Sequence, residues 1–533
     1  MIVGHIGGGS VSAYSIDNSL RFRASNSASI SYTTPASGGD RDKWWIYLPF
    51  KRGRLGVLQY MHGADTASAD SVFFNAADQF CVTIAGTARL VSTRVFRDPT
   101  AWGAALVVYD ASNGTAVQRL RVYERSETVS TFAEMTAWGT DARSGITAGT
   151  AKTMHNSIAH VIGKNPTAAS DYFDGYLTQY RIGTWSGSQP TPANFGSVNT
   201  DGIWVDSGSS ASYGTSGSFL KFNDGTSATT LCYDRSGNAN NWTPSGISTT
   251  AGVTYDWMTD TPTNNYATLN PLSPTTSSAI SQASLYCATP GAYWWNYRGS
   301  QYVTSGKLYF EGTCVSPSFT MIGVATPSAS PTEAYAAPTE SWTYLDGGTK
   351  YGNGSAGLSY GASFTANDVV GVALDLDAGT ITFYKNNVSQ GVAFSTGLTG
   401  KELTPWFGGY NAGRGWYANF GQRPFAYTPP TGFKSLCTAN RPTGDSITTS
   451  GTFDGNLNAD GPFVWLKGNP ETMTINGNAV TWGTHADKTA GGFKVRTASS
   501  SYNNTGSNTY SVSVTGKLFG DIVRAPNTAK GNP

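Results

Sequence analysis

The stretch that decides the fold is Asp368-Val-Val-Gly-Val-Ala-Leu-Asp-Leu-Asp-Ala-Gly-Thr-Ile-Thr-Phe-Tyr-Lys-Asn-Asn387. Its apolar residues recur at every second position, which is the period of a β-strand. They are Val370, Val372, Leu374 and Leu376 in the first half, and Ile381 and Phe383 in the second. Asp377-Ala378-Gly379 separates the halves, and glycine accepts the positive φ of a tight turn. The stretch therefore predicts a β-hairpin, followed by a second turn at Lys385-Asn386-Asn387.

Short segments on both sides of this hairpin extend the pattern. They are Gly306–Gly312 and Ile322–Ala325 before it, and Ala418–Gln422 after it. In composition and in order these segments resemble the SPRY domain, over residues 280–436. The resemblance implies a concanavalin-like β-sandwich that serves recognition, and it implies no catalytic activity, because SPRY domains are binding modules.

The composition limits the class of protein. With 533 residues the chain is too long for one hydrophobic core and favours about three or four domains. Charged residues make up only 13%, and 35 basic side chains nearly balance 34 acidic ones. Nucleic acid is not an expected partner, because a phosphate backbone selects a basic surface. The 63 glycines and the 13% of aromatic residues favour short strands and many turns, so we predict an all-β protein.

The cysteines and histidines show no metal-binding spacing. The five cysteines lie far apart without a CxxC pair, so we expect small buried or half-buried side chains rather than a zinc site or disulfides. They are Cys81, Cys232, Cys287, Cys314 and Cys437. The five histidines are expected at the surface or in loops, where they make hydrogen bonds. They are His5, His62, His155, His160 and His485.

The chain shows no targeting or membrane segment. Residues 1–10 lack the basic start and the long apolar run of a signal peptide, and no apolar window of 18 residues exists. We therefore expect synthesis in the cytoplasm and no membrane insertion. Helical periodicity of useful length is also missing, so any oligomer must form through sheet faces or edges rather than a coiled coil.

Residues 13–200 predict a first β-sandwich. Expected strands are Ser19–Phe22, Trp44–Leu48, Ser71–Phe74, Gln79–Ile84 and Ala104–Tyr109. The closing element, Tyr172–Ile182, resembles the final strand of a laminin-G-like, concanavalin-type lectin domain. Arg97–Trp102 lies before the expected strand Ala104–Tyr109 and Arg119–Tyr123 lies after it, which is the order found in that family. No cofactor is expected: structural calcium is the one candidate, and no clear cluster of Asp and Asn supports it.

Residues 201–279 are rich in Pro, Asn and Gly and predict a structured connector that packs on its neighbours. Asp234–Asn238, Asn241–Thr243 and Thr259–Pro271 resemble a connector of bacteriophage virion proteins that place a laminin-G-like domain ahead of a SPRY domain. In those proteins the SPRY domain closes with a segment like Ala418–Leu436. The resemblance implies a tail fibre or a tail-associated host-recognition protein, located in the virion tail with other tail proteins as partners.

The two ends of the chain complete the predicted organisation. Residues 1–12 form a Gly-rich leader that we expect to attach the protein to the virion. Residues 437–533 predict a small C-terminal β-sandwich, with Asn476-Gly477 as a hairpin turn. Its expected strands lie in Gly461–Leu466, Thr472–Ile475, Ala479–Trp482, Gly492–Arg496 and Tyr510–Val514. Because trimers are usual in fibres, we predict a symmetric homo-oligomer and favour a homotrimer.

The aromatic-rich loops of residues 280–436 are the candidate binding site. Sugar binding needs a ring against the apolar face of a pyranose and polar groups for its hydroxyls. Loops at one end of a sandwich usually carry recognition. We predict a glycan-binding site that includes Trp294, Tyr335, Trp342, Tyr410 and Arg414. For each ring, a place in the hydrophobic core is the alternative.

Catalysis lacks a recognisable motif. A glycosidase needs two carboxylates about 5–9.5 Å apart in one cleft. Glu124 and Glu127 would point to opposite faces of a strand, and the Glu-x-Asp-x-x-Glu pattern of concanavalin-type glucanases is missing. We therefore predict a non-enzymatic virion protein that adsorbs to host bacterial surface polysaccharide. The alternatives are a structural or decorating protein of the tail or capsid and, third, a tailspike-type polysaccharide depolymerase.

Overall fold

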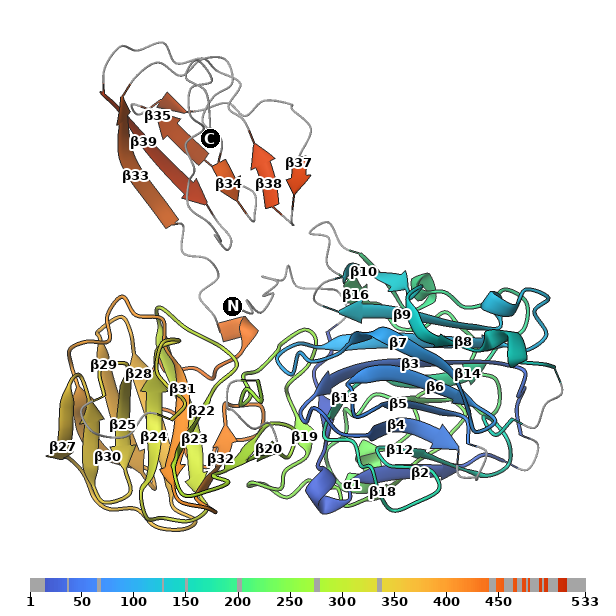
Figure 1. Ribbon diagram of the computed structural model, residues 1–533, viewed down its shortest axis with the longest axis horizontal. Helices are drawn as coiled ribbons and strands as arrows, with labels where there is room; N and C mark the ends of the chain where they lie inside the picture. The colour runs from blue at the N-terminus through green and yellow to red at the C-terminus, as the bar shows by residue number, and fades with distance from the viewer. Residues whose placement is uncertain are drawn as a thin grey trace. The chain divides into compact units, whose positions relative to one another are not determined.

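The computed structural model describes residues 15–440, apart from 36–37, 65–68, 127–128, 149–151, 199–203, 273–278 and 333–337, and strand segments between 447 and 514. The described residues are nearly all β, so the predicted all-β fold is confirmed. Their one α-helix is α1 (Ala228–Leu231). Short 3-10 turns lie at Ala24–Asn26, Ala116–Gln118, Arg143–Gly145, Pro192–Asn194 and Thr438–Asn440. Contacts divide the chain into two compact units, residues 1–439 and 440–533 (Figure 1).

The first compact unit contains two sandwiches. The second of them, hereafter the second sandwich, is drawn in yellow and orange in Figure 1. Its seven-stranded sheet has the order β20 (Ile280–Ser281), β21 (Tyr286–Ala288), β32 (Gly415–Asn419), β23 (Lys307–Cys314), β28 (Val369–Asp375), β29 (Thr380–Lys385) and β30 (Val388–Phe394). Its six-stranded sheet has the order β22 (Trp294–Arg298), β31 (Thr404–Tyr410), β24 (Thr320–Ala325), β25 (Ser341–Leu345), β26 (Thr349–Gly352) and β27 (Ser355–Ser359).

The predicted hairpin is confirmed as strands β28 and β29. Leu374 pairs with Ile381 and Val372 with Phe383, so the apolar residues of both strands share the inner face. All four side chains are buried in the core between the two sheets. Gly379 has φ +68°, as the turn requires. At the next turn Asn386 and Asn387 both have positive φ, the pattern of a type I′ hairpin.

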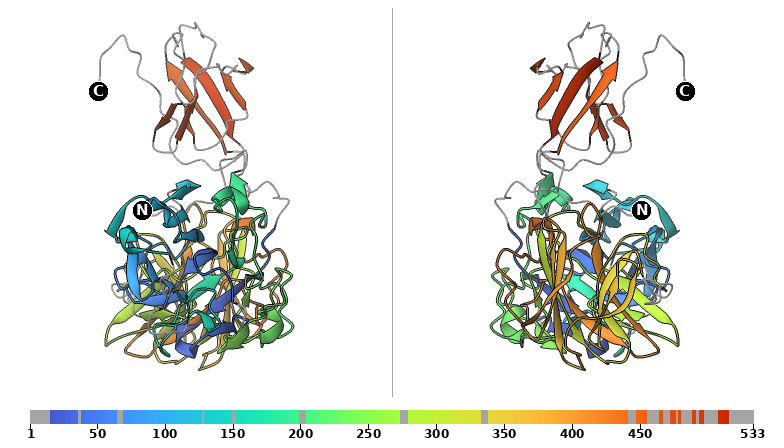
Figure 2. Two further views of the ribbon diagram at one scale, coloured as in Figure 1. Left: turned by 90° about the vertical axis from the view of Figure 1, so that its right-hand side faces the viewer. Right: turned by 90° about the vertical axis from the view of Figure 1, so that its left-hand side faces the viewer.

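The first sandwich is drawn from blue to green, and Figure 2 shows it from two further sides. One sheet has the order β10 (Val129–Glu134), β9 (Leu120–Ser126), β8 (Gly103–Asp110), β3 (Lys43–Arg52), β13 (Gly175–Leu177), β1 (Ser19–Phe22) and β19 (Trp257–Met258), with β14 (Tyr180–Thr184) between β3 and β17 (Ser218–Leu220). The other has the order β11 (Trp138–Asp141), β7 (Thr87–Val95), β6 (Gln79–Ile84), β5 (Ser71–Phe74), β4 (Gln59–Ala64), β12 (Ala159–Ile162), β2 (Ser29–Thr33) and β18 (Thr243–Ser245). A two-stranded sheet pairs β15 (Gly196–Val198) with β16 (Trp204–Asp206).

The segment predicted as a connector, residues 201–279, adds strands to the first sandwich. β17 pairs with β14, β18 with β2 and β19 with β1, so the segment extends both sheets. Its residues Trp242 and Leu231 lie in the core of that sandwich. The turn-rich composition thus hides short strands that depend on an existing sheet for their pairing.

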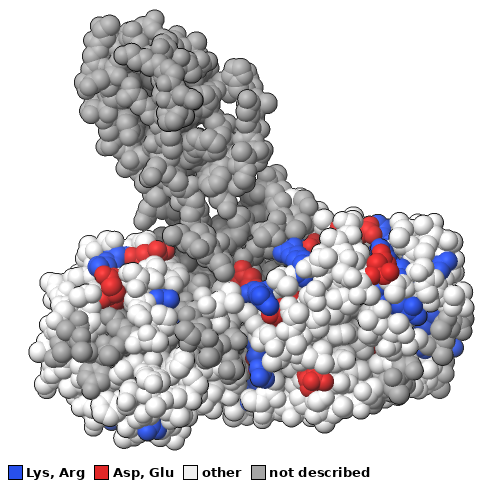
Figure 3. All heavy atoms as spheres, viewed as in Figure 1, with Lys and Arg blue, Asp and Glu red and all other residues white. Residues whose placement is uncertain are grey.

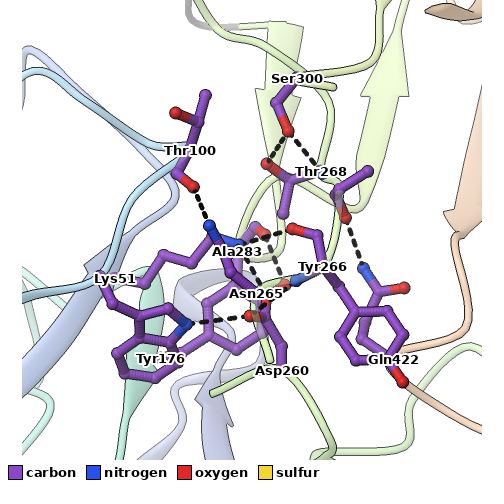
Figure 4. A network of polar contacts seen from close by, with 12 residues as sticks. Lys51, Thr100, Tyr176, Asp260, Asn265, Tyr266, Thr268, Ala283, Ser300 and Gln422 are labelled. Carbon is purple, nitrogen blue, oxygen red and sulfur yellow. Dashed lines mark hydrogen bonds and ion pairs between the residues drawn. The ribbon is translucent and has the colours of Figure 1, made fainter. Parts of the chain in front are cut away.

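A network of buried polar contacts joins the two sandwiches (Figure 4). Lys51 Nζ in β3 lies 2.7 Å from Asp260 Oδ2, and both side chains are fully buried. Lys51 also donates to Asn265 Oδ1 and to the carbonyl of Tyr266. Gln422 in the second sandwich donates to the carbonyl of Ala267 at 3.1 Å. Residues 260–267 therefore make polar contacts with both sandwiches.

A left-handed turn forms a second part of this junction. Gln282, Ala283 and Ser284 connect β20 to β21, and their φ values are +56°, +59° and +59°. Each left-handed residue other than glycine costs roughly 1–2 kcal/mol. Asp174 of the first sandwich accepts hydrogen bonds from the backbone N–H groups of Gln282 and Ala283, and Tyr176 donates to the Ala283 carbonyl at 2.8 Å. Contacts from the first sandwich therefore hold this strained turn.

Three histidines are buried in the first sandwich. The expectation of surface or loop positions is wrong for His62 and His160, which lie in β4 and β12, whereas His155 lies in a loop and bonds to Ser216. His62, His155 and His160 are all buried, and the ring of His160 lies 5.9 Å from that of His62 and 6.3 Å from that of His155. Tyr180 bonds to His62 Nδ1, and His160 Nε2 accepts the His155 N–H. Burial lowers the pKa of His155 to about 3 and of His160 to about 4, and that of His62 well below its usual value. We call these residues the histidine cluster.

The second compact unit contains two small sheets among its described residues. One has the order β33 (Ile447–Asp454), β39 (Ser507–Val514), β35 (Thr472–Ile475) and β36 (Asn478–Ala479), and the other β34 (Val464–Leu466), β38 (Phe493–Arg496) and β37 (Lys488–Ala490). The expected turn Asn476-Gly477 lies outside the described residues.

All five cysteines lie in the first compact unit, where they are buried, as predicted, and unpaired. No helix in the described part of the chain has the length and apolarity needed to cross a membrane.

Candidate binding site

Three aromatic rings gather where β22 begins and β31 ends. Trp294 and Tyr410 are direct partners across these strands, and Phe319 immediately precedes β24. The ring centroids lie 5.6 Å apart for Trp294 and Tyr410, 6.0 Å for Phe319 and Tyr410, and 6.5 Å for Trp294 and Phe319. Trp294 is only 8% exposed, whereas Phe319 is 43% exposed. These three residues, hereafter the aromatic cluster, offer apolar ring surface on a buried base.

The loop that carries Phe319 is strained and firmly held. Ser318 and Phe319 have φ values of +91° and +60°, which bulky residues rarely adopt. Asp346 accepts hydrogen bonds from the N–H groups of Ser318 and Thr320 at 2.8 and 2.9 Å. The Phe319 carbonyl accepts the Tyr410 N–H at 3.0 Å. Such strain persists only where surrounding contacts enforce it, and it concentrates at ligand sites.

Arg414 lies against this loop. Its Nη1 donates to Ser316 Oγ at 2.9 Å, and its backbone N–H donates to Thr289 Oγ1 at 2.9 Å. A Cβ on Gly409 would lie 2.6 Å from the Arg414 Cβ, so the glycine leaves room for the arginine stem. The guanidinium is therefore held next to the loop of Phe319 by one hydrogen bond of its own, and the backbone of Arg414 is held by another.

The structure brings together three of the five predicted site residues. Trp294 and Tyr410 belong to the aromatic cluster, and Arg414 contacts its loop. Trp342 is 1% exposed in β25 and packs in the core between the sheets, so its prediction as a sugar contact is wrong. The alternation of β25 turns Trp342 inward, next to the strand residues of β24. Tyr335 lies outside the described residues.

Phe319 is the site residue that the sequence did not reveal. It stands in the short connection Ser316-Pro317-Ser318-Phe319, which carries no motif. Its conformation depends on Asp346, which is distant in sequence and reaches the loop only because β24 and β25 pair. Local pattern therefore offers no signal for this ring.

Carboxylates of the described residues that were considered for catalysis or lie at the hairpin turn have structural partners. Glu124 is buried in β9 and lies 2.8 Å from Arg94, and burial raises the pKa of its carboxyl. Glu127 lies outside the described residues. Asp375 pairs with Lys307 at 2.9 Å at the end of the hairpin. Among the residues that the structure describes, no group of three or more His, Cys, Asp or Glu side chains could hold a metal ion.

Comparison with known families identifies the second sandwich. Residues 307–423 match the family model of the SPRY domain. This chain contains a SPRY domain. The predicted resemblance is thereby confirmed for this sandwich. Strands β23–β32 and the ring-bearing residues Phe319 and Tyr410 fall within the matched part of the SPRY domain, whereas Trp294 precedes it.

Curated relatives share only a limited stretch with this chain. The chain is 45% identical over 82 residues to the E3 ubiquitin-protein ligase RKP of Arabidopsis thaliana, covering 14% of this chain and 6% of the relative. It is 28% identical over 183 residues to the ATP-dependent RNA helicase DDX1 of Xenopus laevis, covering 32% and 23%. It is 35% identical over 82 residues to the Ran-binding proteins 9/10 homolog of Drosophila melanogaster, covering 15% and 8%. The matches thus span less than a quarter of each of these relatives.

Solved SPRY structures are similar to a limited part of the chain. The SPRY domain of human HERC1 covers 29% of this chain and 99% of its own length, at 23% identity and a TM-score of 0.27. The TRIM65 PSpry domain covers 29% of this chain and 92% of its own length, at 22% identity and a TM-score of 0.24. The assignment of the SPRY domain rests on the family model.

Proposed function

We propose that this chain is a non-catalytic bacteriophage virion protein that adsorbs to a host-cell surface glycan through its SPRY domain. The observation that carries the proposal is the aromatic cluster beside Arg414. An exposed ring such as Phe319 can stack on the apolar face of a pyranose, and a fixed guanidinium can donate to its oxygens. Strain in the loop presets the ring, which lowers the cost of binding.

The charge pattern of the surface does not favour a nucleic acid. On the face shown in Figure 3, charged side chains of the described residues form small scattered groups on an otherwise uncharged surface. Sugar hydroxyls suit such a surface better than a phosphate backbone does. The first sandwich is proposed as a laminin-G-like companion, located with the SPRY domain in the virion tail. Several copies in a homotrimer would raise the avidity for a repeating polysaccharide by roughly 10²–10⁴.

Protein binding is the second candidate function. One relative of the SPRY domain is named a Ran-binding protein homolog, which favours a protein ligand for that relative. In this chain a protein ligand would fit the alternative of a structural or decorating protein, in which the sandwiches contact other virion proteins. A depolymerase stays the third possibility, with its carboxylates drawn from separate strands.

Adsorption of the fluorescently labelled full-length protein to a panel of bacterial cells tests the proposal. Surface polysaccharide extracted from the same cells serves as competitor. We expect the polysaccharide to abolish binding, and Phe319→Ala and Tyr410→Ala to weaken it by about 10-fold each, since loss of a stacking ring costs roughly 1–3 kcal/mol.

Tyr417→Ala is the matched control, because Tyr417 lies in β32 of the other sheet and packs on Tyr286. It should leave adsorption unchanged. Binding that resists the polysaccharide and disappears after protease treatment of the cells would instead support a protein ligand. Particles that fail to assemble without this protein would support the structural role, and new reducing ends in the polysaccharide would support the depolymerase.

A further inference from the structure

Arg414 differs in its partners from Arg52 and Arg181, two fully buried arginines of the first sandwich. Arg52 and Arg181 lie 2.9 and 3.0 Å from the carboxylates of Asp78 and Asp206. Arg414 has no carboxylate partner among the described residues: its one side-chain hydrogen bond goes to the neutral Ser316 hydroxyl. Its Nε is buried and makes no hydrogen bond to any described residue. The positive charge of this guanidinium is thus not neutralised within the described part of the site.

The carboxylate bonded to the neighbouring loop does not supply the missing charge. Asp346 uses one oxygen for the Ser318 N–H and the other for the Thr320 N–H. It serves the backbone of the loop and not the guanidinium. A half-buried arginine that pairs with no carboxylate among the described residues is a ready partner for a carboxylate or phosphate on a ligand, because its planar fork matches both.

Arg414 is held in place at its guanidinium and at its backbone. Ser316 holds the guanidinium, Thr289 holds the backbone N–H, and the Arg414 carbonyl accepts the Thr289 N–H at 2.7 Å. Ser316 and Phe319 belong to one short connection between β23 and β24. The guanidinium is therefore bonded to the connection that carries the exposed ring, and its side chain has little freedom left to lose on binding a ligand.

We propose that the ligand of the SPRY site is an acidic polysaccharide, whose anionic group pairs with Arg414 while a neighbouring sugar ring stacks on Phe319. The inference rests on the proposed glycan-binding function and adds the chemical class of the glycan. The anionic group is a uronate-type carboxylate or a phosphodiester, which present the same charge and the same oxygen acceptors to the guanidinium.

The test uses the full-length protein and polysaccharide extracted from the cells to which it adsorbs. Three forms of the polysaccharide compete for binding: native, carboxyl-reduced and dephosphorylated. We expect one of the two modified forms to compete about 10- to 100-fold less well than the native form, the range expected for one charge-assisted hydrogen-bonded pair. Loss on carboxyl reduction identifies a carboxylate, and loss on dephosphorylation identifies a phosphate.

Variants assign this discrimination to Arg414. Arg414→Gln should bind all three forms equally and weakly, and Arg414→Lys should keep part of the preference for the native form. Arg235→Gln removes the same charge from a half-exposed position in the first sandwich and should change nothing. Equal competition by all three forms against the wild-type protein would overturn the inference. If Phe319→Ala weakens binding in that case, the glycan-binding function still stands, whereas unchanged adsorption by Phe319→Ala and Tyr410→Ala would overturn both.

Discussion

The two sandwiches of residues 1–439 bury different kinds of side chain. The first sandwich buries many ionisable groups, among them the histidine cluster and the pairs Arg52–Asp78 and Arg181–Asp206. In the described part of the SPRY domain the buried ionisable side chains other than tyrosine and cysteine are Glu311, Asp375 and Arg423, and its sequence from 280 to 436 has no histidine. Two sandwiches of similar architecture can therefore respond differently to pH and to loss of a charge.

The difference also separates the tasks of the two sandwiches. In the SPRY domain an aliphatic and aromatic core supports loops that carry the exposed Phe319 ring and the Arg414 guanidinium. In the first sandwich the polar groups turn inward, and those nearest the SPRY domain, such as Lys51 and Asp174, hold the junction. The first sandwich thus supplies the buried polar contacts of the junction, and the SPRY domain carries the candidate site.

Acid should separate the two sandwiches most strongly. The pKa values of the three clustered histidines lie below 6.5 in the folded protein, so the unfolded chain binds more protons as the pH falls below that value. Stability is therefore lost from about pH 6.5 downward. Since one pKa unit corresponds to about 1.4 kcal/mol, three neutral imidazoles would cost about 6 kcal/mol at pH 5, comparable with the stability of a domain. Hydrogen exchange measured by mass spectrometry between pH 8 and 4.5 should show the first sandwich opening first.

A histidine replacement isolates this effect from the buried carboxyl groups. Burial raises the pKa of Asp70 and Asp174, and their protonation in the folded state acts in the opposite direction at low pH. His62→Phe keeps a ring against Tyr180. It should lower by about one the number of protons that the chain takes up on unfolding at low pH, and this number sets the slope of the unfolding free energy against pH. An unchanged dependence, or earlier opening of the SPRY domain, would contradict the comparison.

The buried ion pair of the junction should give the next largest effect. Lys51→Met leaves the Asp260 carboxylate buried without its cation and removes two further hydrogen bonds. Loss of one partner of a buried pair costs about 3–5 kcal/mol. Urea denaturation followed by tryptophan fluorescence would measure it.

Lys307→Met is the matched control for the same substitution. Lys307 pairs with Asp375 at the rim of the SPRY domain, where its side chain is largely exposed, and solvent screens the pair. Its loss should change stability little. The double variant Lys51→Met with Asp260→Asn should recover part of the loss, and failure to do so would show that the charge of Asp260 is not what makes the single variant unstable.

Local alternation predicted the strands whose partners are near in sequence. The hairpin of Leu374 and Ile381 formed as expected, and Ser71–Phe74 and Gln79–Ile84 pair as β5 and β6. Trp342 was predicted to lie in an aromatic-rich loop, but it lies in strand β25, whose pleat turns it into the core. An aromatic residue on a strand buried on both faces gives no local sign of which face it occupies.

The junction and the conformation of the site escaped prediction for a different reason. Lys51 and Asp260 are 209 positions apart, and Arg21 and Asp256 are 235 apart. A pairing at such separation follows from which distant strands the fold brings together, as β1 and β19 in one sheet, and no local pattern records this. Phe319 likewise depends on Asp346 across a strand pair. The aromatic loops could be predicted as a site because Trp294, Tyr410 and Arg414 share a composition typical of binding loops, whereas their mutual geometry could not.

The left-handed turn between β20 and β21 should give the smallest effect and the sharpest test of which sandwich sets the junction. Gln282→Gly should remove about 1–2 kcal/mol of left-handed strain at φ +56°. The added freedom of the unfolded chain costs about 0.5–1 kcal/mol, so a net gain of about 0.5–1 kcal/mol is expected. Ser281→Gly, one residue earlier in extended β20, should destabilise by about 0.5–1 kcal/mol, because it has only the entropic term. The thermal unfolding temperatures of the two variants should then shift in opposite directions.

Because Asp174 of the first sandwich holds the turn through the N–H groups of Gln282 and Ala283, Asp174→Ala should let the turn relax. The gain from Gln282→Gly should then shrink in the Asp174→Ala background. An equal gain in both backgrounds would mean that the strands of the SPRY domain impose the turn by themselves.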